Sequence, residues 1–249
     1  MRRPRRRRRR LILTVAAVLV LGAAGAGAYK LLDKGNSVIG SASPKLTLPT
    51  NEATASDPLF SSKLGKWQHI DTRKLDPVPV TIAQLYPPAF IYPSVGGIQF
   101  LRATANLTKT CGLAVFGDFL QAALQSGGCD QVARASYVSG DQKIMGTIGV
   151  ANLSSTYWAE KAAKTTGAQE LVAPLTASKG PTKNFLKSGT GLAYAEVKGH
   201  YLILLYAEFT DLKAPASATQ KQQLVTFATY MFDGSANISL SQRLLGQAP

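Results

Sequence analysis

The side chains that most often perform chemistry in enzymes are sparse in this sequence. Histidine occurs only as His69 and His200, and the acids nearest to a two-carboxylate site are Glu196 and Glu208. Nucleophilic catalysis needs a nucleophile with a base, and glycoside hydrolysis needs two facing carboxylates. We interpret both histidines as ordinary surface imidazoles, His69 in an irregular segment and His200 at the tip of a predicted hairpin.

The two glutamates lie on the strands of that hairpin, which we predict at 192–198 and 201–209. In this register Glu196 faces Ile203 and lies far along the ribbon from Glu208. The sequence also lacks the nucleophile-elbow, zinc-protease and phosphate-loop motifs. We therefore assign no catalytic, cofactor-binding or metal-binding residue, and no cofactor.

The sequence contains two cysteines, Cys111 and Cys129, whose thiols could react or form a disulfide. In an exported chain, oxidising conditions permit a disulfide between them. If residues 112–126 were all helical, however, the two ends would stand about 20 Å apart, too far for a bridge. The bond therefore requires residues 111–115 to be extended and to run back along a shorter helix that begins near Phe116. The alternative is two free thiols, which could be redox active.

The positive charge is concentrated at the N-terminus. The 249-residue chain has a net charge of +14, of which eight charges are arginines within residues 1–10. We expect this stub to be cytoplasmic and to contact anionic phospholipid. Nucleic-acid binding is the alternative, but the stub lacks the interleaved aromatic side chains that such a site would use.

Residues 11–29 form an uncharged stretch directly after the arginines. As a helix, this stretch would be about 28 Å long, which matches the hydrocarbon core of a bilayer. A basic flank stays in the cytoplasm, so the C-terminal side is sent outward. The segment is predicted to be a single-pass anchor, or alternatively a signal peptide that is cleaved after Ala28. Both interpretations export the remainder of the chain.

The exported part divides into a tether and a domain. Residues 30–94 are rich in Ser, Thr, Pro and Gly and are predicted to be an irregular tether, whereas residues 95–249 carry the periodicity of a fold. Aromatic residues such as Trp67 and Tyr92 indicate that 66–94 docks onto the domain. A hydrophobic groove lined by these rings would favour a binding function.

The domain is predicted to alternate strands and helices. In chain order we expect a strand at 98–107, a helix at 116–125, strands at 131–138 and 143–153, a helix at 155–166, strands at 192–198 and 201–209, and a helix at 217–232. Gly199 and His200 suit a type II′ turn. This order predicts an α+β fold with an antiparallel sheet and helices on one face, a ferredoxin-like βαββαβ core elaborated by a C-terminal hairpin strand and helix.

Two stretches, Cys111–Leu153 and Gly191–Phe209, resemble an uncharacterised family of single-pass exported envelope proteins from high-GC Gram-positive bacteria. The resemblance implies an envelope setting and the cysteine pair, and it brings no assigned activity.

The predicted function is that of a membrane-tethered, non-catalytic extracytoplasmic domain that binds an envelope protein or polymer. It would be anchored in the cell membrane by a single pass, or secreted if cleaved. The alternative is an exported enzyme of unfamiliar type. An enzyme should show a cleft in which a perturbed acid or histidine converges with a second polar group.

Overall fold

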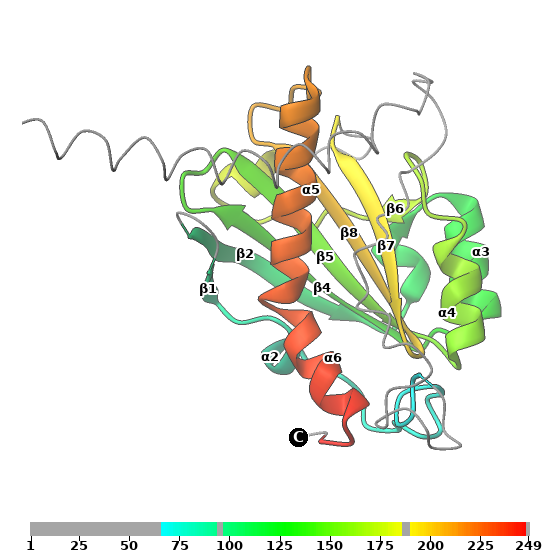
Figure 1. Ribbon diagram of the computed structural model, residues 1–249. Coiled ribbons are helices and arrows are strands. Elements are labelled where there is room, and N and C mark those ends of the chain that lie inside the picture. Colours follow the sequence, from blue (N-terminus) through cyan, green and yellow to red (C-terminus); the bar gives the residue numbers. More distant parts are fainter. Residues whose placement is uncertain (1–65, 94–96, 186–189, 248–249) are drawn as a thin grey trace, which may run out of the picture. The chain divides into compact units, whose positions relative to one another are not determined.

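The structure of this protein is a computed structural model that describes residues 66–93, 97–185 and 190–247 (Figure 1). The predicted stub 1–10, the predicted membrane segment 11–29 and most of the predicted tether lie outside the described residues. Among the residues that are described, no helix has both the length and the apolar character needed to span a bilayer.

Six antiparallel strands form the main sheet, in the order β1-β2-β4-β5-β8-β7. Their bounds are β1 (Ala89–Tyr92), β2 (Ile98–Thr108), β4 (Gln131–Ser139), β5 (Ile144–Asn152), β7 (Leu192–Lys198) and β8 (Tyr201–Phe209). Strands β1 and β7 form the two edges, and β4, β5 and β8 form the centre. Strands β3 (Val115–Phe116) and β6 (Leu171–Val172) form a separate two-stranded sheet that packs in one of the cores.

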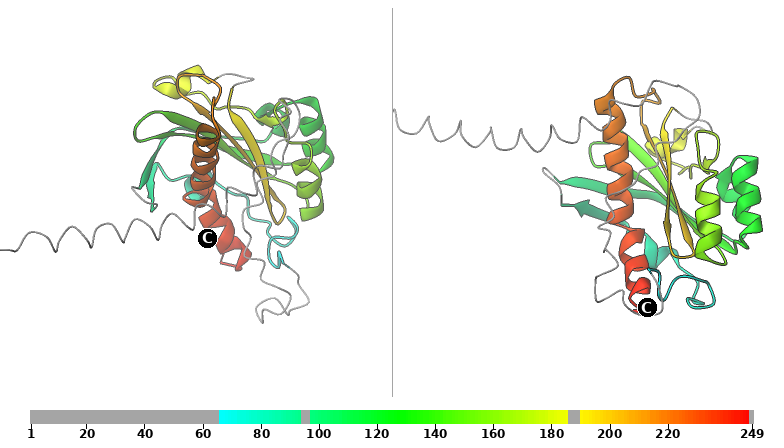
Figure 2. Two further views of the ribbon diagram at one scale, coloured as in Figure 1. Left: turned by 45° about the horizontal axis from the view of Figure 1, so that its top comes forward. Right: turned by 45° about the vertical axis from the view of Figure 1, so that its right-hand side comes forward.

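Helices cover both faces of the sheet, as the two views in Figure 2 show. One face carries α2 (Ile82–Leu85), α5 (Ala218–Asp233) and α6 (Ala236–Leu244), and the other carries α3 (Asp118–Ser126) and α4 (Thr156–Ala163). Two 3-10 helices, Cys111–Ala114 and Pro181–Asn184, complete the elements. Each face therefore has its own hydrophobic core.

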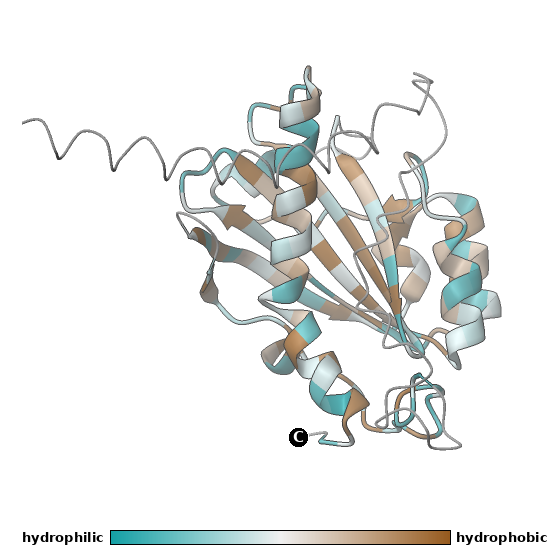
Figure 3. Cartoon of the chain, in the orientation of Figure 1, coloured by the Kyte–Doolittle hydropathy of each residue, from teal (hydrophilic) through white to brown (hydrophobic). Residues whose placement is uncertain are grey.

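The α+β class and the antiparallel sheet are confirmed, but helices on one face only and the ferredoxin-like topology are wrong. Strands β2 and β4, which flank α3, are direct antiparallel neighbours, whereas a split βαβ unit places a third strand between two parallel ones. The central strands also bury apolar side chains on both faces: on β8, Ile203 enters one core and Leu204 the other. A sheet that is apolar on both faces needs a cover on each. Figure 3 shows the resulting hydrophobic bands along the strands.

The β7–β8 hairpin has the predicted bounds and turn. Lys198 pairs with Tyr201, and of the two turn residues only Gly199 has a positive φ, at +59°. This pattern is that of a type II′ turn, in which the first turn residue must adopt a conformation that glycine tolerates. The strands therefore keep the predicted pairing of Glu196 with Ile203.

Residues 66–93 pack onto the face that α5 and α6 cover. Ile70 and Tyr86 are fully buried, and the Tyr86 hydroxyl donates to the carbonyl of Ala133 at 2.9 Å. Trp67 and Tyr92 are partly buried against the same core, and Tyr92 stacks on an α5 tyrosine. These aromatic rings contribute to packing and attach the segment to the sheet.

Candidate functional site

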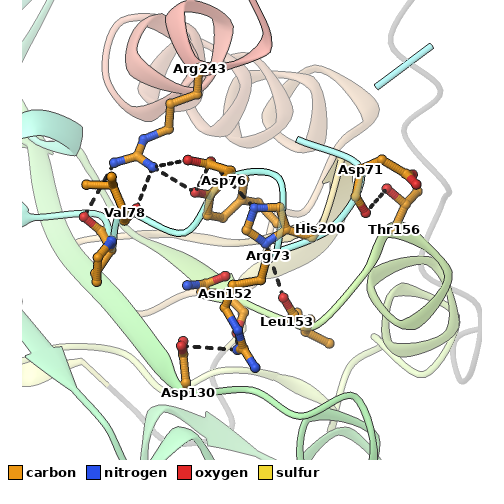
Figure 4. A network of polar contacts seen from close by, with 12 residues as sticks. Asp71, Arg73, Asp76, Val78, Asp130, Asn152, Leu153, Thr156, His200 and Arg243 are labelled. Carbon is orange, nitrogen blue, oxygen red and sulfur yellow. Dashed lines mark hydrogen bonds and ion pairs between the residues drawn. The ribbon is translucent and has the colours of Figure 1, made fainter. Parts of the chain in front are cut away.

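Four polar side chains from distant parts of the sequence meet inside the fold, and Figure 4 labels three of them, Asp76, His200 and Arg243. Asp76 precedes α2, His200 and Tyr201 belong to the β7–β8 hairpin, and Arg243 belongs to α6. Each is at most 6% exposed. We call these four residues the buried clasp, because they join three segments that are separated along the chain.

Asp76 is the centre of the buried clasp. One carboxylate oxygen accepts a hydrogen bond from Nη1 of Arg243 at 2.7 Å, and the other accepts one from the Tyr201 hydroxyl at 2.6 Å. Nε2 of His200 lies 3.5 Å from this second oxygen. Arg243 also donates to the carbonyl of Val78 at 2.6 Å. A buried charge is tolerable only when it is paired and hydrogen bonded, and this geometry meets that demand.

His200 does not lie on the surface, so the prediction of an exposed imidazole at the hairpin tip is wrong. Its ring is fully buried, with Nδ1 3.1 Å from the carbonyl of Leu153. Because a carbonyl can only accept, Nδ1 carries the proton. The hairpin tip folds against the segment before Asp76, and the His200 amide donates to the carbonyl of Ile70 at 2.7 Å.

An aspartate beside a histidine could be part of a catalytic triad, but this pair has a different arrangement. A triad histidine uses one ring nitrogen for the carboxylate and the other for a nucleophilic hydroxyl. In His200 the second nitrogen is bonded to the main-chain oxygen of Leu153. Nδ1 of His200 is therefore engaged by the main chain and does not face a nucleophilic hydroxyl.

The electrostatics of Asp76 agree with a fastening role. Burial by itself raises the pKa of this carboxyl, but the nearby His200 ring, the hydrogen bond from Tyr201 and the charge of Arg243 outweigh it, so the pKa is lowered. Burial and the hydrogen bond to Asp76 raise the pKa of the Tyr201 hydroxyl. The clasp thus favours an ionised Asp76 and a neutral Tyr201, and the contribution of Asp76 to stability falls when acid protonates it.

Arg73 makes a second, more exposed connection between the N-terminal segment and the fold. Its Nη1 donates to the carbonyl of Gly128 at 2.8 Å and lies 3.1 Å from the carboxylate of Asp130. These two residues directly flank Cys129. The segment that contains Asp76 is therefore also held to the end of the disulfide-closed loop.

The disulfide between Cys111 and Cys129 is present, with a Cα separation of 6.3 Å. The predicted shortening of the helix is confirmed, because α3 begins only at Asp118. The predicted extension of residues 111–115 is wrong for Cys111–Ala114, which form a turn of 3-10 helix before the chain extends into β3. Cys111 thus lies near the C-terminal end of α3, and the turn and β3 lead the chain from there to the start of that helix.

Glu170 caps the start of α3, although the sequence gives no local signal for it. Its carboxylate accepts hydrogen bonds from the amides of Leu120, at 2.6 Å, and Phe119, at 3.4 Å. The first amides of a helix have no partner within the helix, and an acid there also favours the helix dipole. The start of α3, which lies inside the disulfide-closed loop, is thus held by a residue that follows the C-terminus of α4 along the chain.

The two hairpin glutamates lie on opposite faces of the sheet, so they form no carboxylate pair. Glu196 shares its face with Tyr194, whereas Glu208 shares the opposite face with Tyr206, whose hydroxyl donates to it at 2.8 Å. Burial raises the pKa of Glu196 to about 7, against the opposing charge of Lys198. Sequence reasoning placed Glu196 correctly in register but could not foresee this burial.

We expect Glu196→Gln to remove part of the pH dependence of stability. A folded-state pKa above the unfolded value means that the folded protein binds the proton more tightly, so stability falls as pH rises from about 4.5 toward 7. Relative to the variant, the wild-type protein should lose about 2 kcal/mol of unfolding free energy across this range. Denaturant titrations at pH 4.5 and pH 8 measure it. The exposed Glu160→Gln is the control, and parallel curves for wild type and Glu196→Gln would contradict the prediction.

Gly199→Ala should destabilise the fold through a close approach at the clasp. A Cβ at this position would lie 2.0 Å from the carbonyl oxygen of Ile70, which accepts the His200 amide. Gly180 also has a positive φ but has nothing within 4 Å of its Cβ position. We expect Gly199→Ala to lower the free energy of unfolding by about 2 kcal/mol more than Gly180→Ala does. Thermal unfolding measures this difference as a larger fall in melting temperature. Equal shifts would show that backbone strain alone matters.

The other candidate positions do not converge on a reactive site. His69 is exposed, and among the described residues no three His, Cys, Asp or Glu side chains are placed to hold a metal. A surface depression of about 480 Å³ lies beside the start of α5. Its charged lining includes Lys143 and Lys213, which pair with Asp141 and Asp211 respectively.

Comparison of this chain with protein-family models, with curated proteins and with solved structures finds no match. The resemblance of Cys111–Leu153 and Gly191–Phe209 to exported envelope proteins stays a prediction.

Proposed function

We propose that this protein is an exported, membrane-tethered domain that binds an envelope protein or polymer and catalyses no reaction. Residues 11–29 would be its single transmembrane helix, and the arginine stub would contact anionic phospholipid on the cytoplasmic side. The disulfide supports an extracytoplasmic setting, because such bonds persist in oxidising compartments.

The observation that carries the binding proposal is the surface of the disulfide-closed loop, residues 111–129. Leu113 is 72% exposed and Phe119 is 75% exposed. Both lie on backbone that is held in place, Leu113 by the bridge beside it and Phe119 by the Glu170 cap. Large apolar side chains on a rigid backbone lose little conformational freedom on binding, which favours affinity.

The buried clasp supports a structural role for these polar residues, which is to hold segments of the fold together, and gives no support to a catalytic role. The Asp76 carboxylate accepts a hydrogen bond from Nη1 of Arg243, and Nδ1 of His200 bonds the carbonyl of Leu153, so these contacts join different segments. These contacts hold the segment around Asp76 against the fold. This segment belongs to the C-terminal part of the proposed tether, which joins the domain. A domain held in this way can present the loop in a constant orientation.

Photo-crosslinking in native membranes tests the proposed binding surface. A photoreactive phenylalanine analogue at Phe119 should give a discrete adduct, and the same analogue at Tyr157, which is 60% exposed on α4, should not. Leu113→Ser should abolish the adduct, whereas Leu245→Ser, which changes another exposed leucine, should leave it intact. Absence of an adduct at Phe119, or turnover of an envelope substrate by the purified protein, would overturn the proposal.

A further inference from the structure

The outer edge of β1 has features that set it apart from the rest of the sheet. The strand comprises only Ala89–Tyr92, and it pairs with β2 on one side. Prolines stand on both sides of it, Pro87 and Pro88 before and Pro93 after. The whole run 87–93 is uncharged, whereas edge strands that avoid association usually carry charged side chains.

The backbone groups that face outward can be assigned from the register. The amide of Arg102 donates to the carbonyl of Pro88 at 2.8 Å, so Pro88 and, by alternation, Phe90 and Tyr92 direct their backbone groups toward β2. Ala89 and Ile91 therefore direct their N–H and C=O groups away from the sheet. Within the described residues no strand pairs with this edge.

We propose that β1 pairs with β1 of a second copy of this chain, antiparallel and about a two-fold axis through Phe90, which joins the two sheets into one. In this register Ala89 faces Ile91 of the second copy and Ile91 faces its Ala89, so every outward N–H and C=O is bonded. The two contacts are equivalent, as a closed two-fold interface requires.

The prolines fit the same register and limit its length. Continuing the pairing by one step places Pro87 opposite Pro93 of the second copy, and neither residue has an N–H to donate. Pairing therefore stops on both sides after the central strand. The edge can close a dimer but cannot extend the ladder further, which is how short proline-flanked edges avoid aggregation.

The side chains on the open face of β1 gain contacts in this arrangement. Ile91 is 67% exposed, and Leu101, which pairs with Ala89 on the neighbouring strand, is 39% exposed. The two-fold axis places Ile91 beside Ala89 and Leu101 of the second copy. Two such clusters form, one on each side of the axis, and together they remove the most exposed aliphatic side chain of this edge from water.

Charge on the opposite face is complementary about the same axis. Arg102 lies at the Pro88 end of β1, where it donates to the carbonyl of Tyr86, and it has no carboxylate partner among the described residues. Asp233 lies at the Tyr92 end, 3.5 Å from the hydroxyl of that tyrosine. An antiparallel pairing brings the Tyr92 end of each copy to the Pro88 end of the other. Arg102 of each copy would therefore lie near Asp233 of the other copy, once on each side of the two-fold axis.

The test is the mass of the full-length chain purified in detergent, measured over a range of concentrations. The wild-type chain should be a dimer, and Ile91→Lys should raise the dimer dissociation constant at least about 100-fold, because it places one ammonium group in each of the two apolar clusters that flank the axis. The variant should still fold, because the Ile91 side chain is exposed in the single chain and makes little contribution to its core. Ile238→Lys changes an isoleucine on α6 that is 55% exposed, and this control should stay dimeric.

Hydrogen exchange gives a second readout that is specific to the register. In the wild-type dimer the outward amides of Ala89 and Ile91 should exchange slowly, and in Ile91→Lys that of Ala89 should exchange fast, while the amides of β4 stay protected in both. A monomeric wild-type chain would overturn the proposal. A dimer that survives Ile91→Lys, for example through the predicted membrane segment, or one that Ile238→Lys also disrupts, would do so equally.

Discussion

Replacing Arg243 with methionine should lower the free energy of unfolding by about 3–5 kcal/mol, because removal of one partner leaves a buried charge without compensation. Asp76 is 6% exposed. Within the buried clasp, Arg243 is the arginine that donates a hydrogen bond to the Asp76 carboxylate and balances its charge. Denaturant unfolding of the full-length chain measures the change. Trp67 and Trp158, the only tryptophans, report it by fluorescence.

Arg73→Met is the matched control, because Arg73 pairs with Asp130 at 3.1 Å where the side chains are 30% and 47% exposed. Partly solvated pairs contribute about 1 kcal/mol or less. The double variant Asp76→Asn/Arg243→Met should recover part of the loss, since it removes the unpaired charge together with its partner. If Arg243→Met is no more destabilising than Arg73→Met, the clasp does not fasten the fold.

Loss of the disulfide should lower stability by about 3 kcal/mol, the loop-entropy value for a bridge of this size. Cys111 and Cys129 are 18 positions apart, and the loop between them contains α3 and the exposed Phe119. The double variant Cys111→Ala/Cys129→Ala and a reductant applied to the wild-type chain should have similar effects. Denaturant titration with and without reductant measures both.

The double variant is also the control for this experiment, because reductant should leave its stability unchanged. Alkylation of the native protein before reduction should label neither Cys111 nor Cys129. Two thiols that react without reductant, or a wild-type stability that reductant does not alter, would contradict the assignment of a structural bridge.

The sequence predicted those elements whose signals are local. The hairpin at Gly199 was predicted residue for residue, because a glycine turn and flanking β-formers are contiguous. Helix α5 was also predicted to within one residue, since Ser217 caps it and Gly234 follows it. Both results depend on interactions between residues that are near neighbours along the chain.

The buried clasp could not be predicted, because its members are distant in the sequence. Asp76 lies 125 positions from Tyr201 and 167 from Arg243. Nothing near His200 distinguishes a buried imidazole from an exposed one, since the groups that bury it come from the segment before α2 and from Leu153. Only the tertiary fold brings them together.

The cover on both faces did have a sequence signal, which lies in the composition of the central strands. Residues 201–209 read YLILLYAEF, apolar at nearly every position, and such a strand is typical of a sheet buried on both sides. Strand β2, which lies between the edge strand β1 and the centre, alternates instead and is half exposed. Alternation of apolar and polar residues is typical of a strand with one exposed face, and its absence in the central strands indicates a cover on both faces.

We propose that residues 30–249 lie outside the cytoplasm, and a reporter fused to the C-terminus tests this export most directly. A phosphatase that folds only where disulfides form should be active in this fusion, whether the segment 11–29 is retained as an anchor or removed. A cytoplasmic fluorescent reporter at the same position should be dark. An inactive phosphatase together with a bright cytoplasmic reporter would contradict export, and with it the proposed envelope partner.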